Sequence, residues 1–543
     1  MKKYFNEENS KLNRNDYLTL LVIIFSYVIL SFINLGDFKA PNTFKHFTKG
    51  DTLIIKKDQN IDKIKLYSGC NNSNIIIYDV FDSNNYSFVI DSRGKGAFAW
   101  TEEDINPKAN TLEIYFKEDT DLGELAFYNK NKLIPVKTYY KNKRIKKLTD
   151  EAKTIPKKIS FMNSTYFDEI YFARSAYEYS KGLKPHEWVH PPLGKLIQAI
   201  PIHLTNNMAP FIYRFMGNIS GIIMLIVMYL FGKMLFKKRK YAIFSSLLMY
   251  FDTFHFVQTR IGTVDSHLVL FIMLSIYFMI KFTIEKNDKY LFLSGLFISL
   301  GISVKWLALY SGIALAFIYI RYLITTKNFN KKYILKGFGY FIILPIFIYC
   351  SLYLLFPNNR GYYTNSISNI IKQQETIYNY HSKLTEKHDF SSPWYSWPIS
   401  YRPIWYYDNT INNTKRGSIV AIGNIIIWWM GIISFLYLLI KFIRKKDLNC
   451  LYLIVIILSL WLPYIFISRA MFLYHYFSVI PFMMLSIVLM FKDIVEKTKK
   501  DYIIGIYLSL VITFFIIYYP VITGIVVNSN YINKLRLLKS WYF

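Results

Sequence analysis

The sequence predicts a polytopic α-helical membrane protein with an inserted extracellular β-sandwich of the jelly-roll type. Three observations predict this fold class. Of the 543 residues, 53% are hydrophobic and only 19% are charged, a composition that is rare in water-soluble proteins. The apolar residues gather in runs about as long as a bilayer core requires, roughly 17 to 25 residues. One long polar stretch alternates in the manner of short strands.

The apolar runs predict about eleven transmembrane helices. Basic clusters such as 236–240 and 444–446 occur in connections that all fall on one side of the membrane, which the positive-inside rule identifies as the cytoplasm. The N-terminus is therefore expected in the cytoplasm and the C-terminus outside. The predicted spans lie near residues 17–35, 211–235, 241–257, 263–284, 290–304, 306–325, 333–356, 418–442, 450–467, 471–491 and 502–527.

This topology divides the chain into seven segments and places two long loops outside, where functional residues are expected. The segments are 1–36, the cytoplasmic N-terminus and first helix; 37–155, the β-sandwich; 156–210, a motif-bearing exterior loop; 211–356, helices two to seven; 357–417, the second exterior loop; 418–527, helices eight to eleven; and 528–543, an exterior tail.

Several classes of function are disfavoured. The net charge of +29 is distributed between apolar runs, which is typical of membrane topology and not of nucleic-acid binding. The three cysteines, Cys70, Cys350 and Cys450, support neither a disulfide framework nor a CxxC metal site. The first apolar run lacks a small-residue cleavage motif and is interpreted as a retained helix.

The stretch from residue 51 to about 140 predicts the sandwich. Strands are expected at 52–56, 74–78, 86–90 and 111–116, separated by Asn, Asp and Gly turns. Trp100 is either a sugar platform or, preferably, a core residue, and no sugar site is assigned to this module. The acids at 102–104 are interpreted as a solvated turn.

Two adjacent acids, Asp168 and Glu169, follow the sandwich at an exterior membrane surface. A positioned carboxylate can act as a general base toward a hydroxyl group, contributing roughly 10²- to 10⁴-fold. On a helix the two side chains point about 100° apart, so they are expected to divide the labour. The alternative is that Asp168 belongs to a capping box with Thr165.

Together with these acids, several further motifs resemble the protein O-mannosyltransferases. The resemblance covers nearly everything except the sandwich, and HPPLGK after an acidic pair is its most specific part. The motifs are Phe-Asp-Glu at 167–169, His-Pro-Pro-Leu-Gly-Lys at 190–195, Thr-Arg-Ile-Gly-Thr-Val-Asp at 259–265, Ser-Val-Lys-Trp at 303–306, 380–382, 392–398, 402–403, Arg469 and 472–476.

The resemblance implies the GT-C fold of enzymes that use polyprenyl-phosphate sugars, with an inverting mechanism (EC 2.4.1.-). It implies transfer of mannose to serine or threonine hydroxyls of exported proteins. Asp168 then matches the base, and Glu169 its neighbour, which holds the acceptor or orients the site. Arg214 matches a family arginine whose guanidinium would hold the donor phosphate. The alternative for Arg214 is an interfacial snorkelling residue.

Charged and aromatic residues near the outer ends of the spans complete the candidate site. An ionised group in hydrocarbon costs about 2.5–3.5 kcal/mol, so such groups should be paired or hydrated. Lys305 and Arg469 are expected to contact the donor phosphate, with Asp265 as structural partner of one of them. His190, Asp265, His381 and Trp394 are candidate donor or acceptor contacts. The alternatives are a turn cap for His190 and the interfacial aromatic belt for His381 and Trp394.

The sequence predicts no metal site and no cofactor, since the lipid-linked sugar is a substrate. The expected partners are polyprenyl-phosphate mannose, secreted or membrane protein acceptors and the bilayer, with proximity to the secretion translocon and no nucleic acid. The expected location is a bacterial plasma membrane. Two alternatives stay open: a related enzyme that transfers another sugar to a lipid or cell-wall acceptor, and a secondary transporter, for which no internal repeat is seen.

Overall fold

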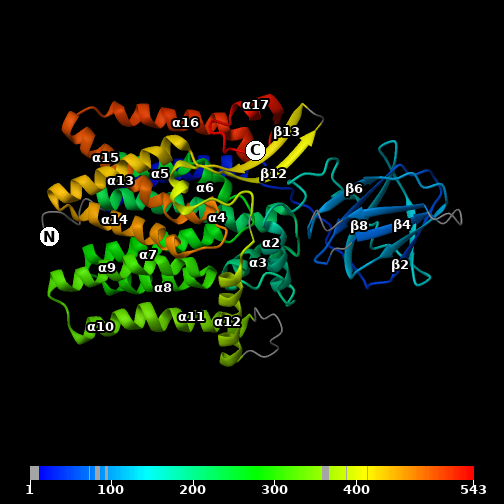
Figure 1. Cartoon of the computed structure of the whole chain (residues 1–543), viewed down its shortest axis with the longest axis horizontal. Coiled ribbons are helices and arrows are strands. Elements are labelled where there is room, and N and C mark those ends of the chain that lie inside the picture. Colours follow the sequence, from blue (N-terminus) through cyan, green and yellow to red (C-terminus); the bar gives the residue numbers. More distant parts are fainter. Residues whose placement is uncertain are drawn as a thin grey trace. The chain divides into compact units, whose positions relative to one another are not determined.

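A computed structural model describes residues 11–71, 74–79, 86–91, 96–356, 366–386, 388–411 and 414–543 (Figure 1). The chain forms two compact units, and each is described by itself. The β-rich unit comprises Asn34–His186 and Leu196–Met216, and the helical unit comprises Met1–Ile33, Glu187–Lys195 and Gly217–Phe543. The expected exterior segment 156–210 is therefore divided between the two units. Parts of the expected loop 357–417 lie outside the described residues.

The β-rich unit contains two antiparallel sheets. One has the strand order β1-β8-β3-β6, with β9 paired to β8, and the other has the order β11-β10-β2-β7-β4-β5. All four strands expected from the sequence are confirmed, as β2, β4, β5 and β7 of the second sheet. The strands are β1 (Lys45–Phe47), β2 (Thr52–Lys57), β3 (Lys63–Ser68), β4 (Asn74–Asp79), β5 (Tyr86–Asp91), β6 (Trp100–Asp104), β7 (Thr111–Phe116), β8 (Thr120–Asn129), β9 (Lys132–Ile134), β10 (Val136–Tyr140) and β11 (Lys143–Ile145).

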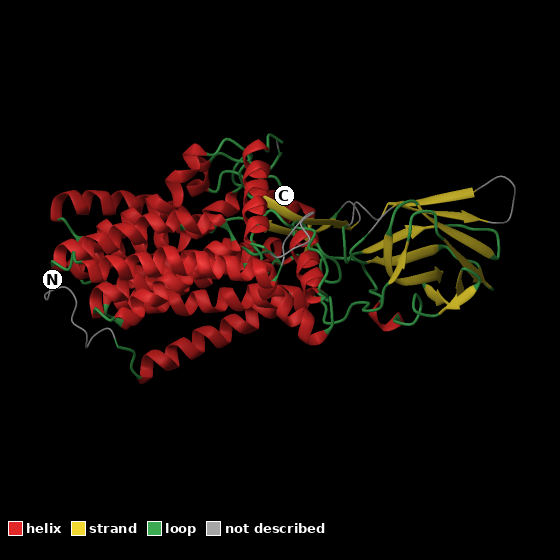
Figure 2. Ribbon diagram, turned by 90° about the horizontal axis from the view of Figure 1, so that it is seen from below, coloured by secondary structure: helices red, strands yellow, loops and turns green. Residues whose placement is uncertain are grey.

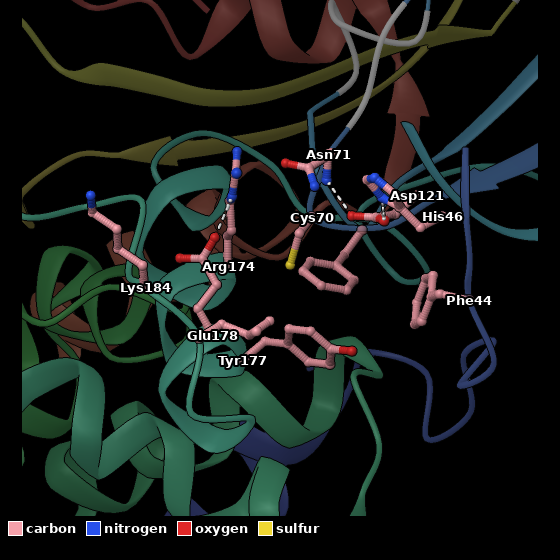
Figure 3. A pocket seen from close by; sticks show the side chains of 11 residues that line it. Phe44, His46, Cys70, Asn71, Asp121, Arg174, Tyr177, Glu178 and Lys184 are labelled. Carbon is pink, nitrogen blue, oxygen red and sulfur yellow. Dashed lines mark hydrogen bonds and ion pairs between the residues drawn. The ribbon is translucent and has the colours of Figure 1, made fainter. Parts of the chain in front are cut away.

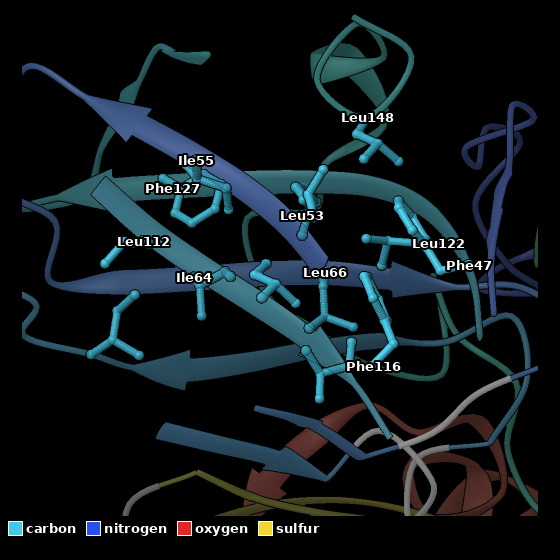
Figure 4. Close-up of a cluster of buried hydrophobic side chains, with 14 of the residues drawn as sticks. Phe47, Leu53, Ile55, Ile64, Leu66, Leu112, Phe116, Leu122, Phe127 and Leu148 are labelled. Carbon is cyan, nitrogen blue, oxygen red and sulfur yellow. The ribbon is translucent and has the colours of Figure 1, made fainter. Parts of the chain in front are cut away.

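Alternating side chains from the two sheets form the sandwich core (Figure 4). In β2, Leu53 and Ile55 are completely buried, whereas Ile54 between them is more exposed, as the two-residue period of a strand requires. Phe47 stacks on Phe116 with a centroid distance of 4.2 Å. Burial of this apolar surface is the main stabilising contribution to the sandwich.

Two sequence expectations for this region have different outcomes. Trp100 is 1% exposed and packs against Tyr67 at 5.2 Å, so its interpretation as a core residue is confirmed. The solvated turn expected at 102–104 is wrong, because these residues form the end of β6 and pair with β3. Lys63 and Lys65 of β3 bind the carboxylate of Glu102 across the strands, and such cross-strand charge pairs favour a strand over a turn.

The helical unit is an assembly of helices that lie side by side (Figure 2). Within the described ranges, eight helices are long and apolar enough to cross a membrane, which confirms a multi-pass membrane protein. They are α1 (Arg14–Phe32), α4 (Pro210–Phe236), α7 (Asp265–Glu285), η4 with α9 (Trp306–Ala308, Leu309–Thr326), α10 to α11 (Lys331–Phe338, Leu344–Leu355, joined by the π-helical η5, Gly339–Ile343), α13 (Ile425–Lys445), α14 with η7 (Leu448–Trp461, Leu462–Phe466) and α16 (Tyr502–Thr523).

The remaining three predicted spans correspond to shorter or more polar helices, so the number eleven stays a prediction. The span expected at 241–257 is broken at Asp252, whose carboxylate caps the following helix by accepting from His255 N. The other helices among the described residues are α2 (Glu169–Ser180), α3 (Leu193–Thr205), α5 (Arg239–Tyr250), α6 (Thr253–Gln258), α8 (Asp288–Val304), α12 (Ile367–Lys383), α15 (Ile480–Thr498), α17 (Ser529–Lys534), and the 3₁₀ helices η3 (Ala152–Thr154), η6 (Trp394–Ile399) and η8 (Leu473–Ser478).

Two predicted span boundaries are wrong. The span expected from 418 begins only at Ile425, because the preceding apolar residues form β13 (Lys415–Ala421), which pairs with β12 (Ile404–Ile411) and β14 (Val526–Asn528). The span expected from 471 begins at Ile480, after η8. A short apolar run fits a buried strand, a 3₁₀ turn or a helix, so composition does not distinguish them.

Candidate active site

Helix α2 begins at the acidic pair. Asp168 is the N-cap residue and Glu169 the first helical residue. Phe167, directly before them, has a left-handed φ of +49°, which is unfavourable for a residue with a Cβ atom. The carbonyl of Asp168 accepts hydrogen bonds from Tyr171 N and Phe172 N, whereas its half-buried carboxylate accepts no cap hydrogen bond from α2. The positive end of the helix favours a negative charge at this position.

The expected capping box with Thr165 is absent from this described segment. The Thr165 hydroxyl donates instead to the carbonyl of Ala97 at 2.6 Å. The Glu169 carboxylate accepts from Tyr166 N at 3.2 Å. Asp168 is therefore not required to cap its own helix.

The Glu169 carboxylate is completely buried and forms a bidentate ion pair with Arg214 of α4. Arg214 Nε donates to Glu169 Oε1 at 2.6 Å, and Nη2 donates to Oε2 at 2.7 Å. The other N–H groups of the guanidinium donate to the carbonyls of Leu35, Phe161 and Ser164. Arg214 is itself only 1% exposed.

This geometry corrects the role expected for Arg214. Each N–H group of its guanidinium has an acceptor within the β-rich unit, so none remains for a donor phosphate in this conformation. Complete burial also excludes an interfacial snorkelling residue. Arg214 instead neutralises Glu169 and joins the start of α4 to the segment before α2. The two acids have different surroundings: Glu169 is buried and paired, and Asp168 is the more accessible carboxylate. Their different roles in the reaction stay a prediction.

The sandwich holds the segment that carries the acids. Trp100 N donates to the Ser164 hydroxyl at 3.0 Å, and Thr165 N donates to the carbonyl of Phe98. Gly96 has a φ of +85°, and a Cβ atom placed there would lie 2.5 Å from Cγ2 of Ile170, in the first turn of α2. The sandwich therefore positions the acidic pair directly.

The HPPLGK motif belongs to the helical unit and is organised by Glu187, a residue that sequence reasoning did not select. His190 Nδ1 donates to Glu187 Oε1 at 2.8 Å. Lys195 Nζ donates to Glu187 Oε2 at 2.6 Å and to the carbonyl of His190 at 2.9 Å. The pKa of Glu187 is depressed: the nearby cation of Lys195 and the hydrogen bonds outweigh burial. The three-residue spacing of Glu187 and His190 was the feature of the sequence that could have predicted this pairing.

Helix α12 brings a second histidine to this motif. His381 Nε2 donates to the carbonyl of Val189 at 3.1 Å, and the rings of His190 and His381 are 5.6 Å apart. His381 Nδ1 is buried and has no hydrogen-bond partner in the described part of the chain. Burial lowers the pKa of His190. Burial, together with the positive charge of Arg469, lowers the pKa of His381 to about 4. Both rings are therefore neutral at pH 7.

Lys305 and Arg469 place two cations near these histidines. Lys305 follows the last residue of α8 and binds Asp265, the first residue of α7, at 2.8 Å. The partner of Asp265 is therefore Lys305 and not Arg469. Arg469, between η7 and η8, has neither an ion pair nor a hydrogen bond with the other described residues. Its charge contributes to the low pKa of His475, which burial lowers to about 3.

Trp394 and Trp397, two tryptophans of the segment 357–417, have different surroundings. Trp397 is completely buried, stacks on His475 at 5.9 Å and donates to Ser392. Trp394 packs on Trp461 at 5.6 Å, at the end of α14, and among the described residues no contact joins it to His381 or Arg469. The structure thus gives Trp394 a packing role, whereas His190, Asp265, Lys305, His381 and Arg469 form one group.

One acidic cluster in the β-rich unit has metal-like spacing. Ligand oxygens of Glu124, Asp150 and Glu151 lie within 4.8 Å of one another. The Glu151 carboxylate already accepts from Asn42 N, Thr43 N and the Thr43 hydroxyl, and burial raises the pKa of Glu124 to about 8. These properties suit a hydrogen-bonded structural cluster, and no metal is assigned to it.

Comparison with known proteins identifies the family. Residues 189–353 match the family model described as dolichyl-phosphate-mannose-protein mannosyltransferase. Residues 366–541 match the model described as the C-terminal four TMM region of protein-O-mannosyltransferase. These ranges contain the group around His190 and Arg469, and they leave out the sandwich and Asp168.

Relatives and a solved structure agree with these matches. Polyprenol-phosphate-mannose–protein mannosyltransferase of Corynebacterium glutamicum is 22% identical over 65% of this chain and 81% of its own length. The Mycobacterium tuberculosis protein of the same name is 20% identical over 69% and 86%. The protein O-mannosyltransferase Pmt1-Pmt2 complex of Saccharomyces cerevisiae, solved bound to the sugar donor, has a TM-score of 0.60 at 14% identity, covering 70% of this chain and 89% of the other. The chain belongs to the protein O-mannosyltransferase family of GT-C membrane glycosyltransferases.

Proposed function

We propose that the protein transfers mannose, with inversion, from polyprenyl-phosphate mannose to serine or threonine hydroxyls of exported proteins. Family membership supports this class of donor and acceptor, and the names of the bacterial relatives agree with it. The observation that carries the assignment of the base is the pair of Glu169 and Arg214. Because Arg214 neutralises Glu169, Asp168 is the acid of the pair that is not held in this ion pair.

Asp168 is proposed to accept the proton of the acceptor hydroxyl. The hydroxyl oxygen attacks C1 of mannose, the bond between C1 and the phosphate oxygen breaks, and the polyprenyl phosphate leaves with the bonding electrons. A hydroxyl is a poor nucleophile until its proton is being removed, so the carboxylate contributes most in the transition state.

Arg469 and Lys305 are proposed to hold the donor phosphate while its charge increases. Arg469 has five N–H donors and no ion-pair partner among the described residues, which suits a phosphate. Lys305 is fixed by Asp265 at 2.8 Å, so its charge is positioned before the donor binds. The histidines are neutral, so the buried Nδ1 of His381 can accept a hydrogen bond from a hydroxyl group of the sugar.

The expected location is a bacterial plasma membrane, with the N-terminus in the cytoplasm and the catalytic loops and C-terminus outside. The basic connections between the apolar helices support this orientation. Exported acceptor proteins would meet the enzyme as they emerge from the secretion translocon. The enzyme is therefore proposed to lie close to the translocon.

The test is transfer of mannose from polyprenyl-phosphate mannose to a peptide that contains serine and threonine, by purified protein in nanodiscs. Asp168→Asn is expected to lower kcat by about 10²- to 10⁴-fold. Asp104→Asn is the matched control, since its side chain is 86% exposed at the end of β6. Near-normal transfer by folded Asp168→Asn would refute the base assignment. If product forms only with a lipid acceptor, the alternative function, transfer of a sugar to a lipid, would replace transfer to protein.

A further inference from the structure

The β-rich unit contains a pocket that the proposed chemistry does not use (Figure 3). Its volume is about 430 Å³, and its lining comes from the sandwich, from helix α2 and from the segment after α2. The partly exposed rings of Phe44 and Tyr177 line it, and both pack on Phe98. The pocket thus offers aromatic surface to a ligand of small-molecule size.

The polar groups of this pocket are held in place by one another. Asp121 accepts from His46 Nδ1 at 2.7 Å and from Asn71 N at 2.9 Å. On the opposite wall, Arg174 Nε donates to Glu178 Oε1 at 2.9 Å. The carboxylates of Asp121 and Glu178 and the guanidinium of Arg174 are therefore preorganised around the space seen in Figure 3.

The balance of charges indicates what class of ligand fits. Arg174 and Lys184 contribute positive charge, and Asp121 and Glu178 contribute negative charge, so an ion of either sign would meet a like charge. A neutral polyol is suited to such walls, because each hydroxyl both donates and accepts a hydrogen bond. The apolar face of a sugar ring packs against an aromatic ring, whose carbon surface is otherwise hydrated.

The position of the pocket relates it to the acidic pair. Arg174 and Glu178 lie on α2, six and ten residues after Asp168, which corresponds to roughly 9 and 15 Å along the helix. An extended polypeptide covers that distance in about three to five residues. A second, more polar cavity of about 400 Å³ shares Asn71 and Arg174 with the pocket and provides room for a neighbouring stretch of chain.

We propose that this pocket binds a neutral hexose already attached to the acceptor polypeptide, about three to five residues from the hydroxyl presented to Asp168. This inference rests on the proposed function. It makes the enzyme favour partly glycosylated acceptors, so that modified residues would occur in clusters. Two elements carry it: the aromatic rings of Phe44 and Tyr177, and the paired charges around Arg174.

The test compares two peptides that differ only in one mannosyl serine placed four residues from the target hydroxyl. Wild-type protein is expected to show a kcat/KM about tenfold higher for the glycopeptide. Arg174→Gln and Tyr177→Ala should bring this ratio close to one. Arg144→Gln, an exposed arginine on β11, is the matched control and should keep the ratio.

Each result has a defined meaning. Equal rates for both peptides in wild-type protein, or a preference that survives Arg174→Gln, would overturn the hexose site. A preference for longer peptides that Arg174→Gln removes regardless of the sugar would replace it by a polypeptide site. If no peptide is modified, the proposed function fails, and binding of methyl α-mannoside is then measured by saturation-transfer NMR. Signal from wild-type protein that is lost in Arg174→Gln would still support the pocket, and equal signals would refute it.

Discussion

Arg214 near the start of α4 and Glu169, the first residue of α2, form a completely buried, bidentate ion pair with N···O distances of 2.6 and 2.7 Å. The pair is supported by three backbone carbonyls that accept the remaining guanidinium protons. Glu169 therefore has a defined structural task. Two acids that are adjacent in the sequence thus become one buried ion-pair partner and one more accessible carboxylate.

Replacement of Glu169 by glutamine should destabilise the protein strongly. The change leaves the buried guanidinium of Arg214 without a counter-charge, and removing one partner of a buried pair costs about 3–5 kcal/mol. Thermal unfolding in detergent would measure the loss. Glu103→Gln on the exposed face of β6 is the matched control and should leave the unfolding temperature unchanged. Equal unfolding temperatures for the two variants would contradict the structural role of the pair.

Gly96→Ala should impair transfer more than it impairs folding. Gly96 and Gly50 both have positive φ, at +85° and +90°, so alanine at either position costs about 1 kcal/mol of backbone strain. Only at Gly96 does the new Cβ atom collide with Ile170, which lies two residues after Asp168. A displaced carboxylate can lower kcat by about tenfold to 10²-fold. Similar kcat values for Gly96→Ala and Gly50→Ala would show that the sandwich does not position the acid.

The sequence was sufficient where local pattern decides the structure. The alternation of apolar residues predicted β2 and β7 to within one residue, and the length of apolar runs predicted most of the long helices. The angle between neighbouring helical side chains also predicted that Asp168 and Glu169 would have different surroundings. These properties depend on a few adjacent residues.

Pairing across long separations in the chain was not predictable. Arg214 lies 45 residues after Glu169, and nothing local to either residue distinguishes a buried ion pair from a phosphate ligand. Asp265 was recognised as a partner for a cation, but the choice of Lys305 over Arg469 depends on how α7 and α8 pack. Glu187 was overlooked because its significance arises only when Lys195 folds back onto it.

Acidification should destabilise the helical unit partly through His381. Its pKa in the folded protein is about 4, below the ordinary 6.5, so the unfolded chain binds the proton more tightly. The stabilising contribution is complete above pH 6.5 and is lost as the pH falls through about 4. Unfolding temperatures between pH 7.5 and 4 should fall less steeply for His381→Asn than for wild-type protein. His190 and His475 also have lowered pKa values, so some acid sensitivity should persist. Identical slopes for the two proteins would contradict the assignment.

Arg469→Gln should weaken binding of the lipid-linked donor and leave binding of the peptide acceptor unchanged. A charge-assisted hydrogen bond contributes about 1.5–3 kcal/mol, so the KM for polyprenyl-phosphate mannose should rise by roughly ten- to 10²-fold. Arg469→Lys keeps the charge but loses the planar pair of donors, and an intermediate KM is expected. Arg444→Gln, in the last turn of α13, is the matched control. A normal donor KM together with a raised peptide KM would place Arg469 on the acceptor side of the reaction and leave Lys305 as the only cation assigned to the phosphate.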